Sequence, residues 1–213
     1  MTGYTFSKLI DGASTYFSQT IFTGPTLTTI GAADAFNRSL ERDVSSGDIP
    51  HVFSSGWVYR IPRVGRISGW EIGGTVRIQA GDAVPVTQAA NALSAFGYAV
   101  QRPVRLRNPN DFANRSVSEW FDTSAFLAAG QFSIGNSSRN PVRGPGLQDA
   151  DLMLGKTFRI SERSSFEIRA EVFNVSNTPP LADPNGSFGS AAFGTIISAG
   201  NPRDFEFAGK VHF

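Results

Sequence analysis

The chain has 213 residues and a net charge of +1, and only 17% of its residues are charged. That charged fraction lies below the roughly 25% typical of soluble domains, and the near-neutral balance excludes the basic field that attracts nucleic acid. The absence of cysteine excludes disulfides, thiolate metal sites and cysteine catalysis. With 18 Phe and 22 Gly, the composition favours an all-β protein over a helical one.

Neither a helical membrane span nor an export signal is visible in the sequence. No apolar run approaches the roughly 18 residues that a transmembrane helix needs. Met1 to Ile10 has neither the basic n-region nor the apolar h-region of a signal peptide. If the protein is exported, we therefore expect the chain to be a fragment whose signal lies upstream.

Alternation of apolar and polar residues with period two predicts long strands, because successive side chains of a strand point to opposite faces. Six such strands are predicted, at about 1–11, 50–62, 67–80, 149–160, 164–175 and 203–213. In the first, Lys8 interrupts an apolar face, and in the fourth Lys156 is the one charge on the apolar side. The apolar face is formed by Tyr4, Phe6, Ile10, Phe53, Trp57, Tyr59, Ile61, Trp70, Ile72, Val76, Ile78, Leu152, Leu154, Phe158, Ile160, Phe166, Ile168, Ala170, Val172, Phe205, Phe207, Val211 and Phe213.

The opposite faces of these strands carry most of the charge. Six side chains there are candidates for lining a substrate path: Glu71, Arg77, Arg159, Glu167, Arg169 and Glu171. The simpler interpretation is that they are ordinary residues of a water-filled interior, paired with neighbours across strands.

The connections between the predicted strands alternate in length. Tight turns are predicted at Pro62–Arg66 and Ser161–Ser164, whereas the other connections span about 11–49, 81–148 and 176–202. Short turns at one end and long loops at the other are typical of transmembrane barrels, whose long loops lie outside the cell. Parity then predicts an antiparallel up-and-down meander, an open segment of a large transmembrane β-barrel. The stretch Phe36–Val44 belongs to an outer loop or strand extension in this interpretation.

Alternation alone also fits a soluble β-sandwich with one wet face. Such a module would bind carbohydrate or another ligand, with Trp57 and Trp70 as stacking platforms. The two hypotheses differ in the apolar faces of the strands. A barrel segment leaves them exposed as one continuous band, and a sandwich buries them against a second sheet.

The sequence predicts no catalytic residue, metal site or cofactor. Gly155-Lys156-Thr157 resembles the end of a phosphate-binding loop, but Ala150 stands where that motif needs glycine and the segment alternates like a strand. No Gly-x-Ser-x-Gly elbow is present, and two distant histidines, His51 and His212, form no metal-ligand cluster.

Several stretches, in this order and spacing, resemble the barrel end of TonB-dependent receptors, particularly the Oar-like group. They are 3–11, 69–81, 120–126, 135–146, 166–177 and 193–203, followed by the strand that ends at Phe213. The resemblance implies a bacterial outer-membrane barrel of about twenty-two strands, plugged by an N-terminal domain and energised through TonB. It implies that residues 1–213 are the C-terminal fragment of such a barrel, inactive alone, with outer-membrane lipid as one partner and TonB as another through the missing plug.

The end of the chain also resembles the C-terminal signature that the barrel-insertion machinery reads. The signature residues are Phe205, Phe207, Gly209, Val211 and Phe213. The simpler interpretation is that Phe213 belongs to an aromatic girdle at the periplasmic interface.

Overall fold

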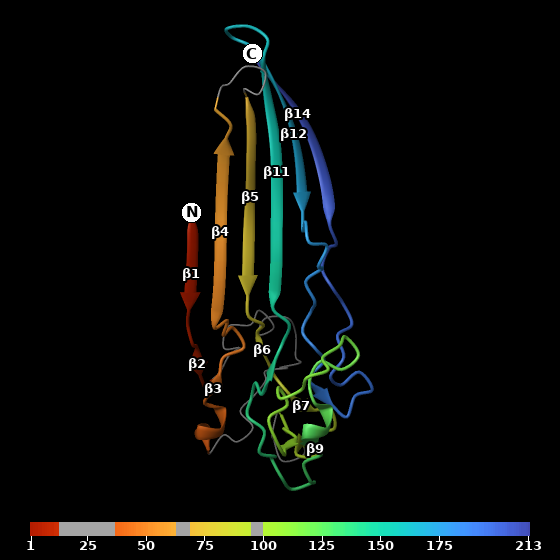
Figure 1. The fold of residues 1–213 in the computed structure, drawn as a ribbon. Helices are drawn as coiled ribbons and strands as arrows, with labels where there is room; N and C mark the ends of the chain where they lie inside the picture. Colours follow the sequence, from red (N-terminus) through yellow and green to blue (C-terminus); the bar gives the residue numbers. More distant parts are fainter. Residues whose placement is uncertain (13–36, 63–68, 95–99) are drawn as a thin grey trace.

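The dominant feature of the protein is a single sheet of six long strands (Figure 1). The fold is that of a computed structural model, which describes residues 1–12, 37–62, 69–94 and 100–213. The strands, in sheet order, are β1 (Thr2–Phe6), β4 (His51–Arg60), β5 (Trp70–Gln79), β11 (Leu147–Arg159), β12 (Ser165–Phe173) and β14 (Asp204–His212). Every neighbouring pair is antiparallel and the order follows the sequence, which confirms the predicted meander.

The first predicted strand is wrong in one respect, because it does not run unbroken over residues 1–11. β1 ends at Phe6, and the separate strand β2 (Ile10–Asp11) pairs with β3 (Asp43–Val44). The break has a physical cause at Pro50, which directly precedes the neighbouring strand β4. Ser7 N–H still donates to the carbonyl of Pro50, but Pro50 has no N–H to return to the ladder.

The 36–44 stretch was predicted to be an outer loop or strand extension, and its described part fits that prediction. It holds the short 3₁₀ helix η2 (Arg38–Glu41) and β3, which pairs with β2 in a separate two-stranded sheet. Residues 63–66 of the predicted tight turn, and the start of the strand predicted from residue 67, lie outside the described residues.

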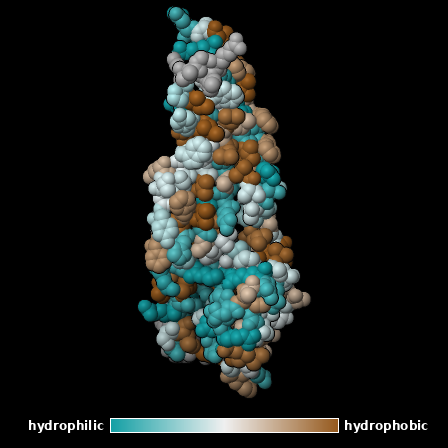
Figure 2. Space-filling model, viewed as in Figure 1, coloured by the Kyte–Doolittle hydropathy of each residue, from teal (hydrophilic) through white to brown (hydrophobic). Residues whose placement is uncertain are grey.

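The strand register places the predicted apolar side chains on one face of the sheet. Tyr59 lies opposite Ile72, Ile72 opposite Leu154, and further pairs continue the face to Phe207. Most of this apolar face is exposed; Phe207, for example, is 76% exposed. In Figure 2 hydrophobic side chains are spread along the strands, whereas hydrophilic ones gather over the loop end. In the described part of the chain no second sheet covers this face, so the sandwich hypothesis lacks support.

Aromatic side chains form two rows near the ends of the apolar face. At the short-turn end Phe158 and Phe166 stack with ring centroids 6.4 Å apart. Lys156, the charge that interrupted the predicted apolar face, places its ammonium 5.1 Å from the centroid of the Trp70 ring. At the loop end, Tyr4 and Phe53 lie opposite each other. Between these rows the central strands carry the aliphatic side chains of Ile72, Leu152, Leu154 and Val172, and the strands β4 and β14 add Trp57, Tyr59, Phe205 and Phe207. An apolar band with aromatic side chains near both ends is typical of bilayer-spanning strands.

The described parts of the long connections are folded into a packed body at the lower end of the sheet in Figure 1. Its core contains Val84, Val86, Phe121, Ala125, Phe126 and Val142, with Trp120, Phe188 and Phe193 packed against it. Short elements frame this loop body: β6 (Ala83–Val84), β7 (Thr87–Gln88), β8 (Val104–Arg105), η5 (Thr123–Ala125), β9 (Phe126–Leu127), β10 (Val142–Arg143) and β13 (Ser187–Phe188). The only parallel pairing among the described strands, β13 with β7, lies here and is two residues long.

No helix among the described residues has the length and the hydropathy needed to cross a bilayer.

Candidate functional site on the polar face of the sheet

The polar face of the sheet is the candidate functional surface, because the register collects nearly all of the strand charges there. Each of its cross-strand rows joins residues that lie opposite one another on neighbouring strands. One row runs from Arg60 through Glu71 and Gly155 to Arg169. The six predicted path-lining residues all occupy this face, as their alternation with the apolar side chains requires.

Arg169 and its neighbours on β12 form the main charged cluster of this face. The Arg169 guanidinium donates to Glu167 at 2.9 Å and lies 3.5 Å from Glu171. His212 of β14 approaches the other oxygen of Glu167 at 3.7 Å. The structure therefore brings three of the predicted residues together in one ionic group.

The other predicted residues are distributed over the face. Glu71 accepts a 2.6 Å hydrogen bond from Arg60, its opposite neighbour, and the sequence reasoning did not single Arg60 out. Arg77 donates to Gln79 on its own strand at 3.0 Å. Arg159 lies opposite Ser165 at the short-turn end. The pairing of Glu71 with Arg60 agrees with the simpler interpretation of these charges as mutually neutralising neighbours.

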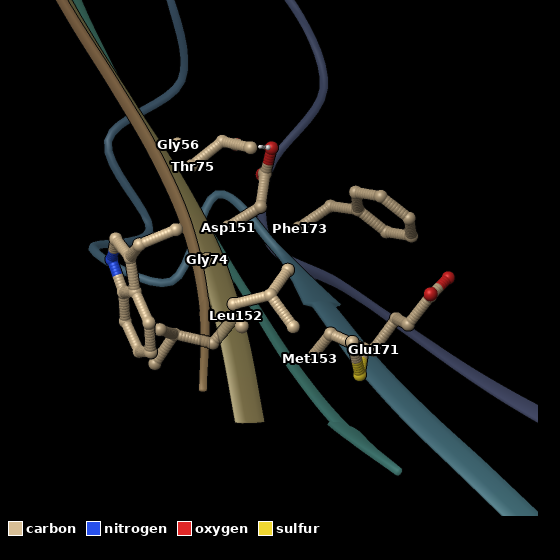
Figure 3. Close-up of a pocket in the computed structure, with 11 residues that line it drawn as sticks. Gly56, Gly74, Thr75, Asp151, Leu152, Met153, Glu171 and Phe173 are labelled. Atoms are coloured by element: carbon tan, nitrogen blue, oxygen red, sulfur yellow. Dashed lines mark hydrogen bonds between the residues drawn. The ribbon is translucent and has the colours of Figure 1, made fainter. Parts of the chain in front are cut away.

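A hollow interrupts the polar face midway along the strands, and we call it the glycine hollow (Figure 3). Its volume is about 390 Å³, and its lining consists of Gly56, Trp57, Val58, Gly73, Gly74, Thr75, Asp151, Leu152, Met153, Glu171 and Phe173. A Cβ atom added to Gly56 would meet nothing within 4 Å. The hollow has room because two diagonally adjacent positions on β4 and β5, Gly56 (opposite Thr75) and Gly73 (opposite Val58), have no side chain.

Hydrogen bonds fix the polar groups around the hollow. Thr75 Oγ1 donates to one carboxylate oxygen of Asp151 at 2.8 Å, and the N–H of Asn174 donates to the other at 3.1 Å. Figure 3 shows Thr75 and Asp151 near Phe173, with Met153 and Glu171 further along the hollow. The hollow was not predicted, although glycines inside a predicted strand are a known sign of a close approach or an open space.

Ion pairs tie the loop body together next to this surface. Arg102 donates to Glu41 at 2.6 Å with both side chains buried, and Arg143 pairs with Asp48. Burial disfavours the charged Asp48, but the hydrogen bonds from the Leu9 N–H and Arg143 outweigh it and lower the pKa of that carboxyl. Sequence reasoning missed these pairs because their members are far apart in the chain.

The predicted signature residues lie on β14, an edge strand of the sheet. Phe205, Phe207, Gly209 and Val211 face the same side as the apolar face of β12, opposite Val172, Ala170, Ile168 and Phe166. Phe213 follows the strand and is exposed.

Among the residues that the structure describes, no three His, Asp or Glu side chains are grouped so that they could hold a metal ion.

Comparison with known proteins agrees with this two-faced sheet. A family model described as an outer membrane beta barrel domain matches residues 1–206. Searches of curated proteins and of solved structures gave no match. One assignment follows from three observations: an apolar face suited to lipid, a charged opposite face, and this match over nearly the whole chain. The chain belongs to the outer membrane beta barrel domain family and is part of a barrel protein in the outer membrane.

Proposed function

We propose that the chain forms one wall of a TonB-dependent outer-membrane transporter and contributes no catalysis of its own. The observation that carries the proposal is the division of one antiparallel sheet into an exposed apolar face and a charged face. The apolar face would contact acyl chains, and the polar face would line the water-filled interior. The ordered similarity of several stretches to TonB-dependent receptors supports the finer assignment.

The edges of the sheet support a larger barrel. β1 and β14 each have one neighbour in the sheet, so each presents a row of unpaired backbone groups. In hydrocarbon each unpaired N–H or C=O costs several kcal/mol, and the smallest single-chain bacterial barrels close with about eight strands. Further strands, and a plug that contacts TonB, would come from the rest of a longer polypeptide.

The size of the native protein tests the first part of this proposal. An antibody against the loop body should detect, in native outer membranes, a protein several times larger than the 22.9 kDa of this chain. Peptide mass spectrometry of that band should identify sequence that precedes Met1. A single band at 22.9 kDa would contradict the proposal that the chain is a segment of a larger transporter.

Dependence on TonB tests the second part. Culture media can be compared by mass spectrometry after growth of the wild type, a strain lacking this gene and a strain lacking TonB. Some compounds should be taken up by the wild type but remain in the medium of the strain lacking this gene. The same compounds should remain in the medium of the strain lacking TonB. Uptake of those compounds without TonB would refute energised transport through this protein.

We also propose that β14 is the segment that the barrel-insertion machinery binds. An edge strand can add to an exposed sheet edge through its backbone while alternate side chains enter apolar pockets. β14 offers both features, with a free edge and the exposed side chains of Phe205 and Phe207.

The test separates a signal from an anchor. In the full-length protein, Phe213→Ser removes the terminal ring, and a short polar extension after Phe213 leaves that ring in place. A signal role predicts severe loss of folded protein in the outer membrane after the extension, measured by heat-modifiable migration in gels. Normal assembly of both variants would rule out recognition of β14.

A further inference from the structure

The glycine hollow combines apolar walls with an unusual local excess of negative charge. Val58, Met153 and Phe173 provide apolar side chains, and Gly56 and Gly73 keep the floor low. The Met153 side chain lies over Gly73, where a Cβ atom would meet Met153 Cε at 3.3 Å. The space is therefore open above Gly56 and closed towards the short-turn end by the methionine.

Two neighbouring rows of the polar face carry negative charges only. The row that contains Gly73 and Met153 continues to Glu171 and Glu206. The neighbouring row towards the loops contains Thr75 and Asp151, and Phe173 beside them lies opposite Asp204. These two rows thus hold four carboxylates: Asp151, Glu171, Asp204 and Glu206. Their members contain no Lys or Arg. Arg60, Arg159, Arg169 and Lys210 lie nearer the short turns, and Arg77, opposite Asp149, lies in the next row towards the loops.

Glu171 and Glu206 are directly opposite each other on β12 and β14. Like charges in that position destabilise a sheet, because the two Cβ atoms lie only about 5 Å apart. Arg169 relieves this repulsion only in part, since it lies 3.5 Å from Glu171 and donates to Glu167 at 2.9 Å. A second positive charge between Glu171 and Glu206 would stabilise both carboxylates.

We propose that the glycine hollow binds a small organic cation. The apolar part of the ligand would contact Met153 and Phe173, whose ring can also attract a cation through its π face. Its ammonium group would lie between Glu171 and Glu206. A bare metal ion fits less well, because Ca²⁺ and Mg²⁺ take about six or more oxygen ligands and the walls here are mostly apolar.

The inference rests on the proposed placement of the polar face in the water-filled interior, and TonB has no part in it. A direct binding measurement on the detergent-solubilised protein from native outer membranes therefore tests it separately from transport. Benzyltrimethylammonium is the cationic probe. Neopentylbenzene, in which carbon replaces the nitrogen, is the neutral control, and phenylacetate is the anionic control.

Two variants locate the binding. Glu171→Gln should weaken benzyltrimethylammonium binding about fivefold, as expected for loss of one unit charge at contact distance in a wet site. Gly56→Ile adds a side chain that strands accommodate and should abolish binding by filling the open space. Asp149→Asn removes one charge from the same face outside the lining of the hollow, opposite Arg77, and should leave the affinity nearly unchanged.

The expected result is saturable binding of the cation, weaker binding of the neutral isostere and none of the anion. Equal affinity for the cation and the neutral isostere would overturn the proposal. Unchanged cation binding in Glu171→Gln would also overturn it. Because Gln is nearly isosteric with Glu, this variant tests the proposal even if Gly56→Ile does not fold. Failure of the cation to bind at concentrations up to about 10 mM, beyond the weakest useful affinity, would also overturn it.

Discussion

A positive charge placed at the middle of the apolar face tests most directly whether that face contacts lipid. Leu152 is exposed on this face, opposite Gly74 and Val172, and Leu152→Arg is the perturbation. The next residue, Met153, lies on the polar face opposite Gly73 and Glu171. Met153→Arg is therefore a matched control, with the same new side chain one position along the same strand.

The depth of Leu152 follows from its place in β11. It lies six positions from Phe158 in the aromatic row at the short-turn end and four from Gln148, which is opposite Ile78 in the other row. At about 3.3 Å per residue these intervals are about 20 Å and about 13 Å along the strand. For strands tilted by about 40° they correspond to about 15 Å and about 10 Å of depth, which places Leu152 near the bilayer midplane.

The magnitude follows from that depth. Arg at the midplane of a lipid-facing strand destabilises a barrel by about 2–4 kcal/mol, and the penalty falls towards zero near the interfaces. Met153→Arg loses its methionine contacts with Gly73 but gains Glu171 as a partner, so its net effect should stay within about 1 kcal/mol. The difference between the two variants is the informative quantity.

The measurement is reversible unfolding of the barrel protein in phospholipid vesicles by guanidinium chloride. The intrinsic fluorescence of the three tryptophans, including Trp57 and Trp70, reports insertion and unfolding. Midpoints and slopes give the free energy of unfolding for each variant. Equal destabilisation by the two substitutions, or a greater loss for Met153→Arg, would refute the lipid contact of the apolar face.

Two further predictions concern the loop body. Phe121 is fully buried against Phe126 and Phe193, so Phe121→Ala should destabilise the loop body by about 3–5 kcal/mol and make it sensitive to protease in intact membranes. The control Phe132→Ala, at a side chain 79% exposed, should resist digestion like the wild type, and equal resistance of Phe121→Ala would contradict a packed core. Because its pKa is lowered from 3.8, Asp48 stabilises the loops above about pH 3.8, and this contribution is lost as the pH falls through the folded-state pKa. Hydrogen exchange of the Leu9 amide, corrected for its intrinsic rate, should accelerate over that acidic range in the wild type. In Asp48→Ala, which removes the acceptor of the Leu9 N–H, exchange should be fast at every pH, and slow exchange in this variant would contradict the prediction.

The long strands could be predicted because their signal is local. Alternation places Trp70, Ile72 and Val76 on one face whatever their partners are, since the side-chain period of a strand is two. The tight turns and the even number of predicted strands were then compatible with one antiparallel strand order. The end of β1 could not be predicted, because it depends on Pro50, which directly precedes the neighbouring strand β4 and lies more than forty positions away in the chain.

The loop body and the hollow were decided only by tertiary structure. Arg139 pairs with Asp11, 128 positions earlier, and no local pattern connects the two. The stretch Trp120–Phe126, noticed only for its resemblance, supplies Phe121, Ala125 and Phe126 to the core.

Sequence by itself determined which side chains share a face of each strand. Gly56 lies near Glu171 only because the registers of β4, β5, β11 and β12 are as they are. A shift of one residue between any two of these neighbouring strands would put Gly56 and Glu171 on opposite faces of the sheet. Register is set by hydrogen bonds and packing between segments that are distant in the chain. Alternation, which is a property of each segment alone, therefore specified the two faces of the sheet and left the hollow on the polar face undetermined.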